Sequence, residues 1–176
     1  MKCEYCEIVG EERRDNRIYE DEQVIAFVRD MAALPGQVTV IPKEHFTILE
    51  LVPDDILAAV AKAAQKVSVA VFEGFNSKGT NIIVQNGIAG GQKMSHFALE
   101  VIPRQEGDGL NLQWQPKQLM EDEMEMAFST LGGAAAKLID VGKGKHVKKE
   151  PAPGGASPAP LEEKENYLLK SLRRRP

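Results

Sequence analysis

Residues 96–103, with the sequence HFALEVIP, alternate between large apolar side chains and a second, more mixed set. A period of two is typical of a strand, because its successive side chains point to opposite faces of the sheet. Phe97, Leu99 and Val101 share one face and are expected to lie in the core. The opposite face combines a histidine with a carboxylate and is the candidate functional face: His96, Ala98, Glu100 and Ile102.

The segments around this strand predict further strands and turns. Residues 18–30 are typical of two short strands around an acidic turn, and residues 37–42 alternate and contain β-branched side chains, which favours a strand. Residues 80–85 predict a buried strand, and the glycine-rich residues 87–92 predict a turn. Strands with segregated helices indicate an α+β fold with an antiparallel sheet.

Two segments predict helices. Residues 53–72 begin with Pro53 and two aspartates, which suit a first helical turn. Six apolar side chains recur there at helical spacing and are expected to face the sheet: Ile56, Leu57, Val60, Ala64, Val67 and Val71. Residues 117–139 predict a second helix, which Gly132 and Gly133 are expected to be able to interrupt.

The composition is that of a globular protein, with 43% hydrophobic and 27% charged residues in a chain of 176. No apolar run reaches the roughly 18–20 residues that cross a bilayer, and the start of the chain lacks the apolar stretch of a secretory signal. Two cysteines are too few for a disulfide scaffold and favour a reducing, cytoplasmic setting. The net charge of −4 argues against a dedicated nucleic-acid-binding protein.

The composition changes toward the C-terminus, so we expect one domain over residues 1–143 and an appendage after it. Residues 144–160 are rich first in lysine and then in proline and glycine, which predicts a linker. Residues 161–176 have early glutamates and late arginines, an order that suits the dipole of a short helix. This last segment is either a solvated tail or a helix that docks on the domain or on a partner.

Cys3 and Cys6 leave two interpretations open: two unrelated thiols, or half of a metal site. A redox CxxC motif follows a strand and opens a helix, and this N-terminal position offers neither. His45 follows one predicted strand and His96 opens another, whereas His146 lies outside the predicted domain. A zinc site made of Cys3, Cys6, His45 and His96 would have no open coordination position and would therefore be structural.

Several short motifs follow one another in residues 3–104. In chain order they are Cys3-x-x-Cys6 with Glu7-Ile8-Val9, Tyr19-Glu20-Asp21, Ala26-Phe27, Pro35-Gly36, Val40-Ile41-Pro42-Lys43-x-His45, Gly87-x-Ala89-Gly90-Gly91-Gln92, and His96 leading to Ile102-Pro103-Arg104. In this order and spacing they resemble the histidine-triad (HIT) family, in its zinc-bearing, nucleotide-hydrolase-like branch. The resemblance implies an antiparallel sheet with a long helix, a two-fold homodimer, and a structural zinc ion held by Cys3, Cys6, His45 and His96.

The triad positions depart from the family. The family has histidine at three alternating positions of this strand, where this chain has His96, Ala98 and Glu100. By the resemblance, the middle histidine attacks the α-phosphate and carries a nucleotidyl intermediate, but Ala98 has no nucleophilic atom. The third histidine contributes to phosphate binding, whereas Glu100 is negatively charged at neutral pH and repels a phosphate. We therefore expect no catalytic residue of the family type.

Two further positions of the family's pocket are altered. The acidic ribose-binding position aligns with Arg29, with Asp30 one residue late, and the asparagine before the glycine-rich turn aligns with Gln85, with Asn86 one residue late. A slip of one residue in a strand normally reverses the face of a side chain. These changes favour drift of an old pocket over an engineered replacement at Ala98 alone. The expected nucleotide-binding set is Phe27, Arg29, Asp30, Gln85, Asn86, Gly91, Gln92, Lys93 and Glu100.

The sequence thus predicts a HIT-fold protein that keeps a zinc-stabilised scaffold and binds a nucleoside or nucleotide without the family's nucleophile. Lys93 either supplies positive charge to that ligand or is simply solvated. One alternative is a weak hydrolase of nucleotide phosphoramidates or dinucleoside polyphosphates, with Glu100 as general base for water and with Lys93 and Arg29 holding the ligand. The other is a dimeric interaction protein in which residues 161–176 recruit a partner. Neither a membrane nor a nucleic acid is expected as a partner.

Overall fold

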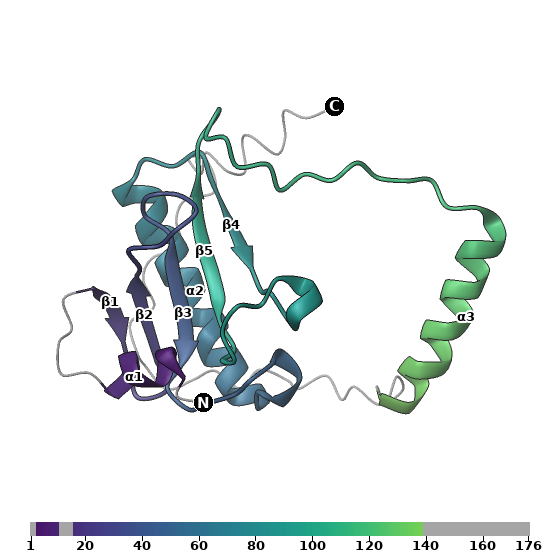
Figure 1. Cartoon of the computed structure of the whole chain (residues 1–176), viewed down its shortest axis with the longest axis horizontal. Coiled ribbons are helices and arrows are strands. Elements are labelled where there is room, and N and C mark those ends of the chain that lie inside the picture. Colours follow the sequence, from purple (N-terminus) through teal and green to yellow (C-terminus); the bar gives the residue numbers. More distant parts are fainter. Residues whose placement is uncertain (1–2, 11–15, 139–176) are drawn as a thin grey trace, which may run out of the picture. The chain divides into compact units, whose positions relative to one another are not determined.

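The computed structural model describes residues 3–10 and 16–138, and its central feature is a five-stranded antiparallel sheet (Figure 1). The strands are β1 Arg17–Glu20, β2 Val24–Val28, β3 Val38–Pro42, β4 Gly79–Ile83 and β5 Leu99–Arg104. Their order across the sheet is β1-β2-β3-β5-β4, and every neighbouring pair is antiparallel. The predicted α+β class and antiparallel sheet are confirmed, and β5, the strand of Glu100, lies inside the sheet.

Helices and short turns complete the described part of the chain: α1 Glu4–Gly10, α2 Asp54–Gly74, α3 Glu121–Leu138, and the single 3-10 turns η1 Leu49–Leu51 and η2 Ile88–Gly90. The chain divides into two compact units with a boundary after Leu110. The first unit holds the sheet, α1 and α2, and α3 belongs to the second. This boundary falls inside the range 1–143 expected as one domain. The predicted linker at 144–160 and helix at 161–176 lie outside the described residues.

Helix α2 covers one face of the sheet. Val60, Ala64, Val67 and Val71 are buried against the sheet in one apolar cluster, and Ile56 and Leu57 pack against it while partly buried. The predicted sheet-facing stripe of this helix is therefore confirmed. Two aspartates in the first turn of α2 interact favourably with the helix dipole.

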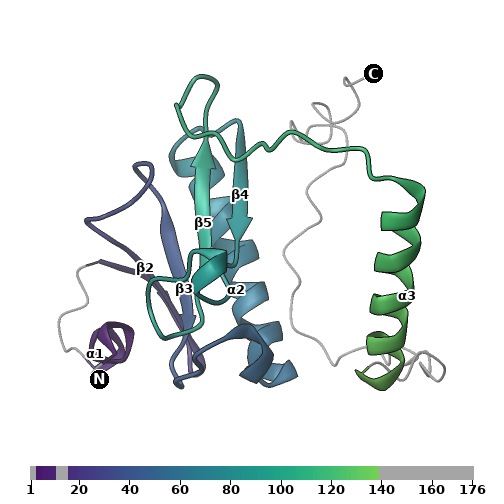
Figure 2. The ribbon, with the colours of Figure 1, turned by 45° about the vertical axis from the view of Figure 1, so that its right-hand side comes forward.

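Helix α1 lies on the opposite side of the sheet from α2 (Figure 2). Tyr5 of α1 is buried with three residues of β2 and β3: Ile25, Phe27 and Ile41. The Arg17 guanidinium donates hydrogen bonds to the carbonyls of Ile8 and Val9, which belong to the last turn of α1 and have no partner within the helix. An apolar contact and a cationic cap thus attach this short helix to the sheet.

The structure corrects three details of the sequence-based description. β4 is an edge strand with β5 as its one sheet neighbour, so it is not buried, and Ile82 is 51% exposed. β5 begins at Leu99, so the backbone at His96 and Ala98 precedes the strand, although the alternation of faces continues through them. α3 begins at Glu121 and continues through Gly132 and Gly133, because glycine weakens a helix by only about 1 kcal/mol.

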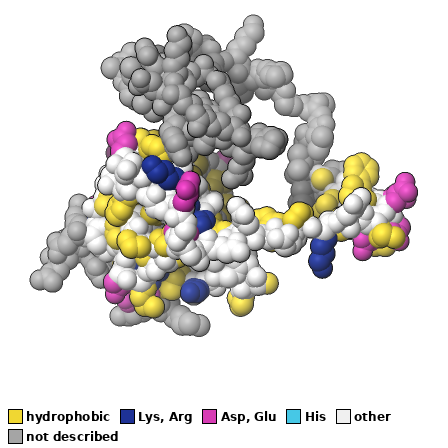
Figure 3. All heavy atoms as spheres, turned by 90° about the horizontal axis from the view of Figure 1, so that it is seen from above, with side chains coloured by type: hydrophobic (Ala, Val, Ile, Leu, Met, Phe, Trp, Pro, Cys, Tyr) yellow, Lys and Arg dark blue, Asp and Glu magenta, His cyan; other side chains and the backbone are white. Residues whose placement is uncertain are grey.

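Helix α3 combines an acidic first turn with exposed apolar side chains. Glu121, Asp122 and Glu123 form that turn, and four large apolar residues further along are exposed: Met124, Met126, Phe128 and Leu131. Figure 3 shows yellow and magenta side chains intermixed on this helix, at the right of the view. None of the described helices has the length and apolar character needed to cross a bilayer.

Candidate metal centre and ligand pocket

Two cysteines and two histidines meet where α1 approaches the sheet. Sγ of Cys3 lies 3.5 Å from Nδ1 of His96, and Sγ of Cys6 lies 3.2 Å from Nδ1 of His45 and 3.6 Å from Nδ1 of His96. One ligand atom from each of the four residues lies within 4.8 Å of the others. The structure therefore brings together all four residues that the spacing and the resemblance assign to a metal.

The separations within this cluster fit a tetrahedral metal ion. With Zn–S near 2.3 Å and Zn–N near 2.0 Å, neighbouring S and N ligands of a tetrahedral zinc are about 3.5 Å apart. The sulfur–nitrogen distances of 3.2, 3.5 and 3.6 Å agree with that value. A set of two thiols and two imidazoles favours zinc over magnesium or calcium, which prefer oxygen ligands.

The orientation of His96 also suits a metal ligand. Its side chain is buried, and its Nε2 lies 3.0 Å from the carbonyl oxygen of Pro42. Since a carbonyl only accepts, Nε2 carries the proton and donates it there, which leaves the lone pair of Nδ1 directed at the cysteine sulfurs. Burial lowers the pKa of His96, so the neutral imidazole required of a ligand is favoured.

The two remaining triad positions lie beside this cluster, on the face of the sheet that α1 covers. In the register of the sheet, Glu100 of β5 lies opposite Thr39 of β3, and Thr39 lies opposite Phe27 of β2. These three residues therefore form one row across the three strands. The Thr39 hydroxyl donates to the Glu100 carboxylate at 2.9 Å, and the Gln37 amide donates to it at 2.9 Å. Ala98 is partly buried near the apolar cluster around Tyr5 and presents only a methyl group. At this face the triad positions offer an alanine and a carboxylate held by two neutral donors.

Arg29 follows β2 and turns toward α1. Its guanidinium donates to the Tyr5 hydroxyl at 2.9 Å, lies 5.4 Å from the centre of the Tyr5 ring, and forms an ion pair with Glu4 at 3.2 Å. Burial raises the pKa of Tyr5, the charge of Glu100 raises it further, and Arg29 lowers it. The Tyr5 side chain therefore lies within electrostatic reach of both Glu100 and Arg29.

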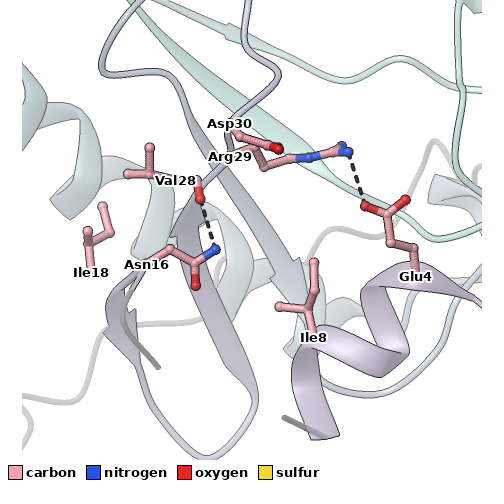
Figure 4. Close-up of a pocket in the computed structure, with 7 residues that line it drawn as sticks. All are labelled: Glu4, Ile8, Asn16, Ile18, Val28, Arg29 and Asp30. Atoms are coloured by element: carbon pink, nitrogen blue, oxygen red, sulfur yellow. Dashed lines mark hydrogen bonds and ion pairs between the residues drawn. The ribbon is translucent and has the colours of Figure 1, made fainter. Parts of the chain in front are cut away.

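A cavity of about 670 Å³ opens beside Arg29 (Figure 4). Polar residues at its edge are Glu4, Asn16, Arg29 and Asp30, and its apolar lining is Ile8, Ile18 and Val28. Figure 4 shows Arg29 reaching across to Glu4, and the Asn16 amide donating to the carbonyl of Val28. The volume and the mixed lining suit a small organic molecule.

The glycine-rich turn uses two of its expected ligand residues for its own structure. Asn86 accepts a hydrogen bond from the Leu49 backbone and donates to the Glu50 carboxylate. The Gln92 side chain accepts from the backbone N–H of Gly87 and donates to two carbonyls, those of Thr47 and Met94. These amides therefore hold the turn in place.

The four remaining expected ligand residues are Gln85, Gly91, Lys93 and Phe27, and none of them lines the cavity beside Arg29. Gly91 has φ of +88°, and a Cβ there would lie 2.7 Å from the Gln85 amide nitrogen, so Gln85 packs on the turn itself. Lys93 is exposed, and within the described chain it forms no ion pair with Glu100. Phe27 is fully buried under Tyr5 and contributes to the floor of the face rather than to an open surface.

Sequence reasoning missed four residues of this face: Glu4, Tyr5, Gln37 and Thr39. Tyr5 lies between the two cysteines, so a metal that fixes both cysteines also fixes Tyr5 and Glu4. Thr39 and Ile41 are two residues apart on β3 and therefore face the same side of the sheet, so the alternation of the sequence could have identified Thr39 as part of this face. The contact of Gln37 with Glu100 depends on the pairing of β3 with β5, which the sequence alone does not specify.

Comparisons with known proteins agree with this geometry. A family model described as "HIT domain" matches residues 10–107, more than half of the chain. An uncharacterized HIT-like protein of Methanocaldococcus jannaschii is 36% identical over 107 residues, 61% of this chain and 82% of that protein. An adenylylsulfatase of Arabidopsis thaliana is 29% identical over 124 residues, and the match spans 70% of this chain and 61% of that protein.

A solved structure adds a comparison for the metal centre. The crystal structure of a zinc-bound histidine triad family protein from Mycobacterium smegmatis matches with a TM-score of 0.59 and 32% identity, over 76% of this chain and 98% of that chain. Its zinc is a property of that protein. The similarity shows that a related chain of the same fold is found with the metal that the Cys3, Cys6, His45 and His96 cluster would suit.

Proposed function

The chain belongs to the histidine-triad family, and from that premise we propose that it binds a nucleoside or nucleotide non-covalently and lacks the family's covalent mechanism. The proposal depends on one observation, the pair of side chains at the second and third triad positions. Ala98 offers no nucleophile, and Glu100 presents a carboxylate at the position where the family's third histidine contributes to phosphate binding. Ligand binding is supported by the cavity beside Arg29 and by the adenylylsulfatase among the relatives.

We further propose that Cys3, Cys6, His45 and His96 hold a zinc ion with a structural role. With four protein ligands the ion has no open position for substrate or water, so what it supplies is cross-linking of α1 to the sheet. The residues of this chain prepare the site: Pro42 fixes the ring of His96, and Arg17 holds the end of α1. Because Glu4 lies between the two cysteines and lines the cavity beside Arg29, the same cross-link positions one wall of that cavity.

A two-fold homodimer and a cytoplasmic location are also part of the proposal. The edge position of β4 in the described sheet supports a homodimer, as do two exposed apolar residues in or directly after this strand, Ile82 and Val84. Pairing of two such edges would cover the unpaired backbone groups that an open edge presents. Cys3 and Cys6 are free thiols rather than a disulfide, which suits a reducing compartment.

The hydrolase alternative has less support. Glu100 accepts hydrogen bonds from the Thr39 hydroxyl and the Gln37 amide, so these two contacts already occupy the carboxylate that would have to accept a proton from water. A turnover of an adenosine phosphoramidate that disappears in Glu100→Gln would nevertheless establish it.

Two measurements on the full chain test the proposed function. Adenosine and adenosine monophosphates should raise the melting temperature, because a ligand that binds only the folded state stabilises it by about 2.7 kcal/mol at a hundred times its Kd.

Incubation with a radiolabelled adenosine phosphoramidate should leave no acid-labile adduct on the protein. Restoring histidine by Ala98→His alone should recover little activity, because Glu100 still repels the phosphate. An adduct trapped on any histidine of the unmodified chain would refute the loss of covalent chemistry, and no binding of any of these compounds at millimolar concentration would refute the nucleoside pocket.

A further inference from the structure

Helix α3 carries an apolar stripe that solvent reaches. Its members recur at alternating helical spacings of four and three residues and therefore lie on one side of the helix: Met124, Phe128, Leu131 and Ala135. The side chains of Met124, Phe128 and Leu131 are 58%, 80% and 68% exposed. In a folded protein, a stripe of this kind is normally packed against another element.

Helix α3 needs such packing to be stable. Isolated helices of about its length are marginal in water, and most of the stability of a helix in a protein comes from the packing of its apolar side. Gly132 and Gly133 weaken α3 further, each by about 1 kcal/mol relative to alanine. We therefore looked for a surface with a matching apolar pattern and matching charges.

The C-terminal segment, residues 161–176, has a matching apolar pattern. On a helix, Leu161, Leu168 and Leu172 would lie on one side, because they are seven and four residues apart. Residues 139–160 connect this segment to α3 and give the chain enough length to turn back. The length of this connection costs little, because each doubling of a flexible loop adds only about 0.6 kcal/mol.

The charges of the two segments are complementary when the segments run in opposite directions. α3 begins with three acidic residues, and the C-terminal segment ends with three arginines before Pro176: Glu121, Asp122 and Glu123 in the first group, Arg173, Arg174 and Arg175 in the second. An antiparallel arrangement brings these opposite charges together. A parallel arrangement would instead bring Glu162 and Glu163 to the acidic turn, where like charges repel.

We propose that residues 161–176, which lie outside the described residues, form a helix that packs antiparallel on the apolar stripe of α3. In one register the two stripes meet in three apolar pairs: Met124 with Leu172, Phe128 with Leu168, and Ala135 with Leu161. The same register places the three arginines opposite the acidic turn, and Leu131 opposite Glu165 as a mismatched pair. This proposal does not depend on the nucleoside pocket.

Hydrogen exchange in the full chain, measured by mass spectrometry on peptides from α3, tests whether the stripe is covered. A packed helix exchanges its amide hydrogens more slowly than an isolated one, so α3 should be protected in the unmodified chain. Phe128→Asp and Leu168→Asp should each raise the exchange rate of α3 by about tenfold or more, because either change places a charge in the apolar contact.

Each of these variants has a matched control on the opposite side of its helix. Met126→Asp changes a residue that is 70% exposed and lies away from the stripe, and Tyr167→Asp makes the corresponding change in the C-terminal segment. Both controls should leave α3 protected. Joint replacement of the three arginines, Arg173→Gln, Arg174→Gln and Arg175→Gln, should lower the protection, as should added salt in the unmodified chain, because both weaken the ion pairs.

Several results would overturn the proposal. If α3 exchanges in the unmodified chain as fast as an unfolded peptide, nothing covers the stripe. If protection survives Leu168→Asp, another surface covers it, and if protection falls on dilution of the protein, that surface belongs to a second copy of the chain. If Met126→Asp removes protection as fully as Phe128→Asp, the effect comes from aspartate within the helix and not from a contact. Peptides from α2 show in the same experiment that each variant keeps its sheet-bound helix folded.

Discussion

The imidazole of His96 makes contacts through both ring nitrogens. Nε2 donates to the carbonyl of Pro42 on β3, and Nδ1 faces the sulfurs of Cys3 and Cys6 at 3.5 and 3.6 Å. Neither contact depends on a ligand in the pocket. At the residue scale, the side chain at the first triad position therefore contacts both β3 and the two cysteines. The side chains at the second and third positions make neither of these contacts.

The residue-scale prediction concerns the metal. Purified without chelator, the chain should carry about one zinc ion, and Cys6→Ser should lose it. Even a loss of about 2 kcal/mol in the free energy of unfolding, a small part of the ~10–16 kcal/mol of a structural zinc site, should lower the melting temperature of a chain of this size by roughly 4–8 °C. Circular dichroism should show α2 intact, because its buried face does not touch the cluster.

The control for this variant is Ser95→Ala, which changes an exposed side chain next to His96. It should keep both the zinc and the melting temperature. Elemental analysis that finds no zinc in the unmodified protein, together with two thiols that react freely in the folded state, would contradict the site.

At the scale of elements, the glycine-rich turn depends on its backbone conformation. Gly91 ends η2 with φ of +88°, a conformation that other residues adopt only with strain, and a Cβ there would lie 2.7 Å from the Gln85 amide. Gly91→Ala should therefore lower the free energy of unfolding by about 1–2 kcal/mol in a denaturant titration. Gly90→Ala is the matched control: its nearest neighbouring atom is 4.0 Å away, and its cost should stay below about 0.5 kcal/mol. Equal costs for the two variants would show that the turn is not held in this conformation.

The burial pattern within a helix or strand could be predicted from the sequence, but the neighbours of a strand in the sheet could not. The alternation of residues 96–103 and the helical spacing of residues 53–72 specify which side chains are buried, since burial follows the period of each element. The buried strand expected at residues 80–85 is instead a half-exposed edge, because an apolar run does not state how many neighbours a strand has. Local patterns identify the four residues that the structure brings together, Cys3, Cys6, His45 and His96. They do not identify the contact between Arg29 and Tyr5, which depends on how α1 docks on the sheet.

At the scale of the whole molecule, the open edge of the sheet predicts self-association. Light scattering should give about twice the chain mass of 19.4 kDa. Ile82→Lys places a charge at an exposed position of the edge strand β4 and should shift the mass toward that of one chain. Ile18→Lys is the control, since Ile18 is half exposed on β1 at the opposite edge, and it should leave the dimer intact. A mass of one chain for the unmodified protein would refute the dimer.

The division of tasks along the strand around β5 has an evolutionary consequence. The side chain that fastens the strand to α1 and β3 is His96, whereas Ala98 and Glu100 lie outside the cluster of Cys3, Cys6, His45 and His96. Substitutions at the latter two positions can therefore accumulate without weakening the fold on which they lie. A protein lineage with this arrangement can lose its ancestral catalytic activity while its fold stays stable. The cavity that remains can then evolve to bind a different molecule.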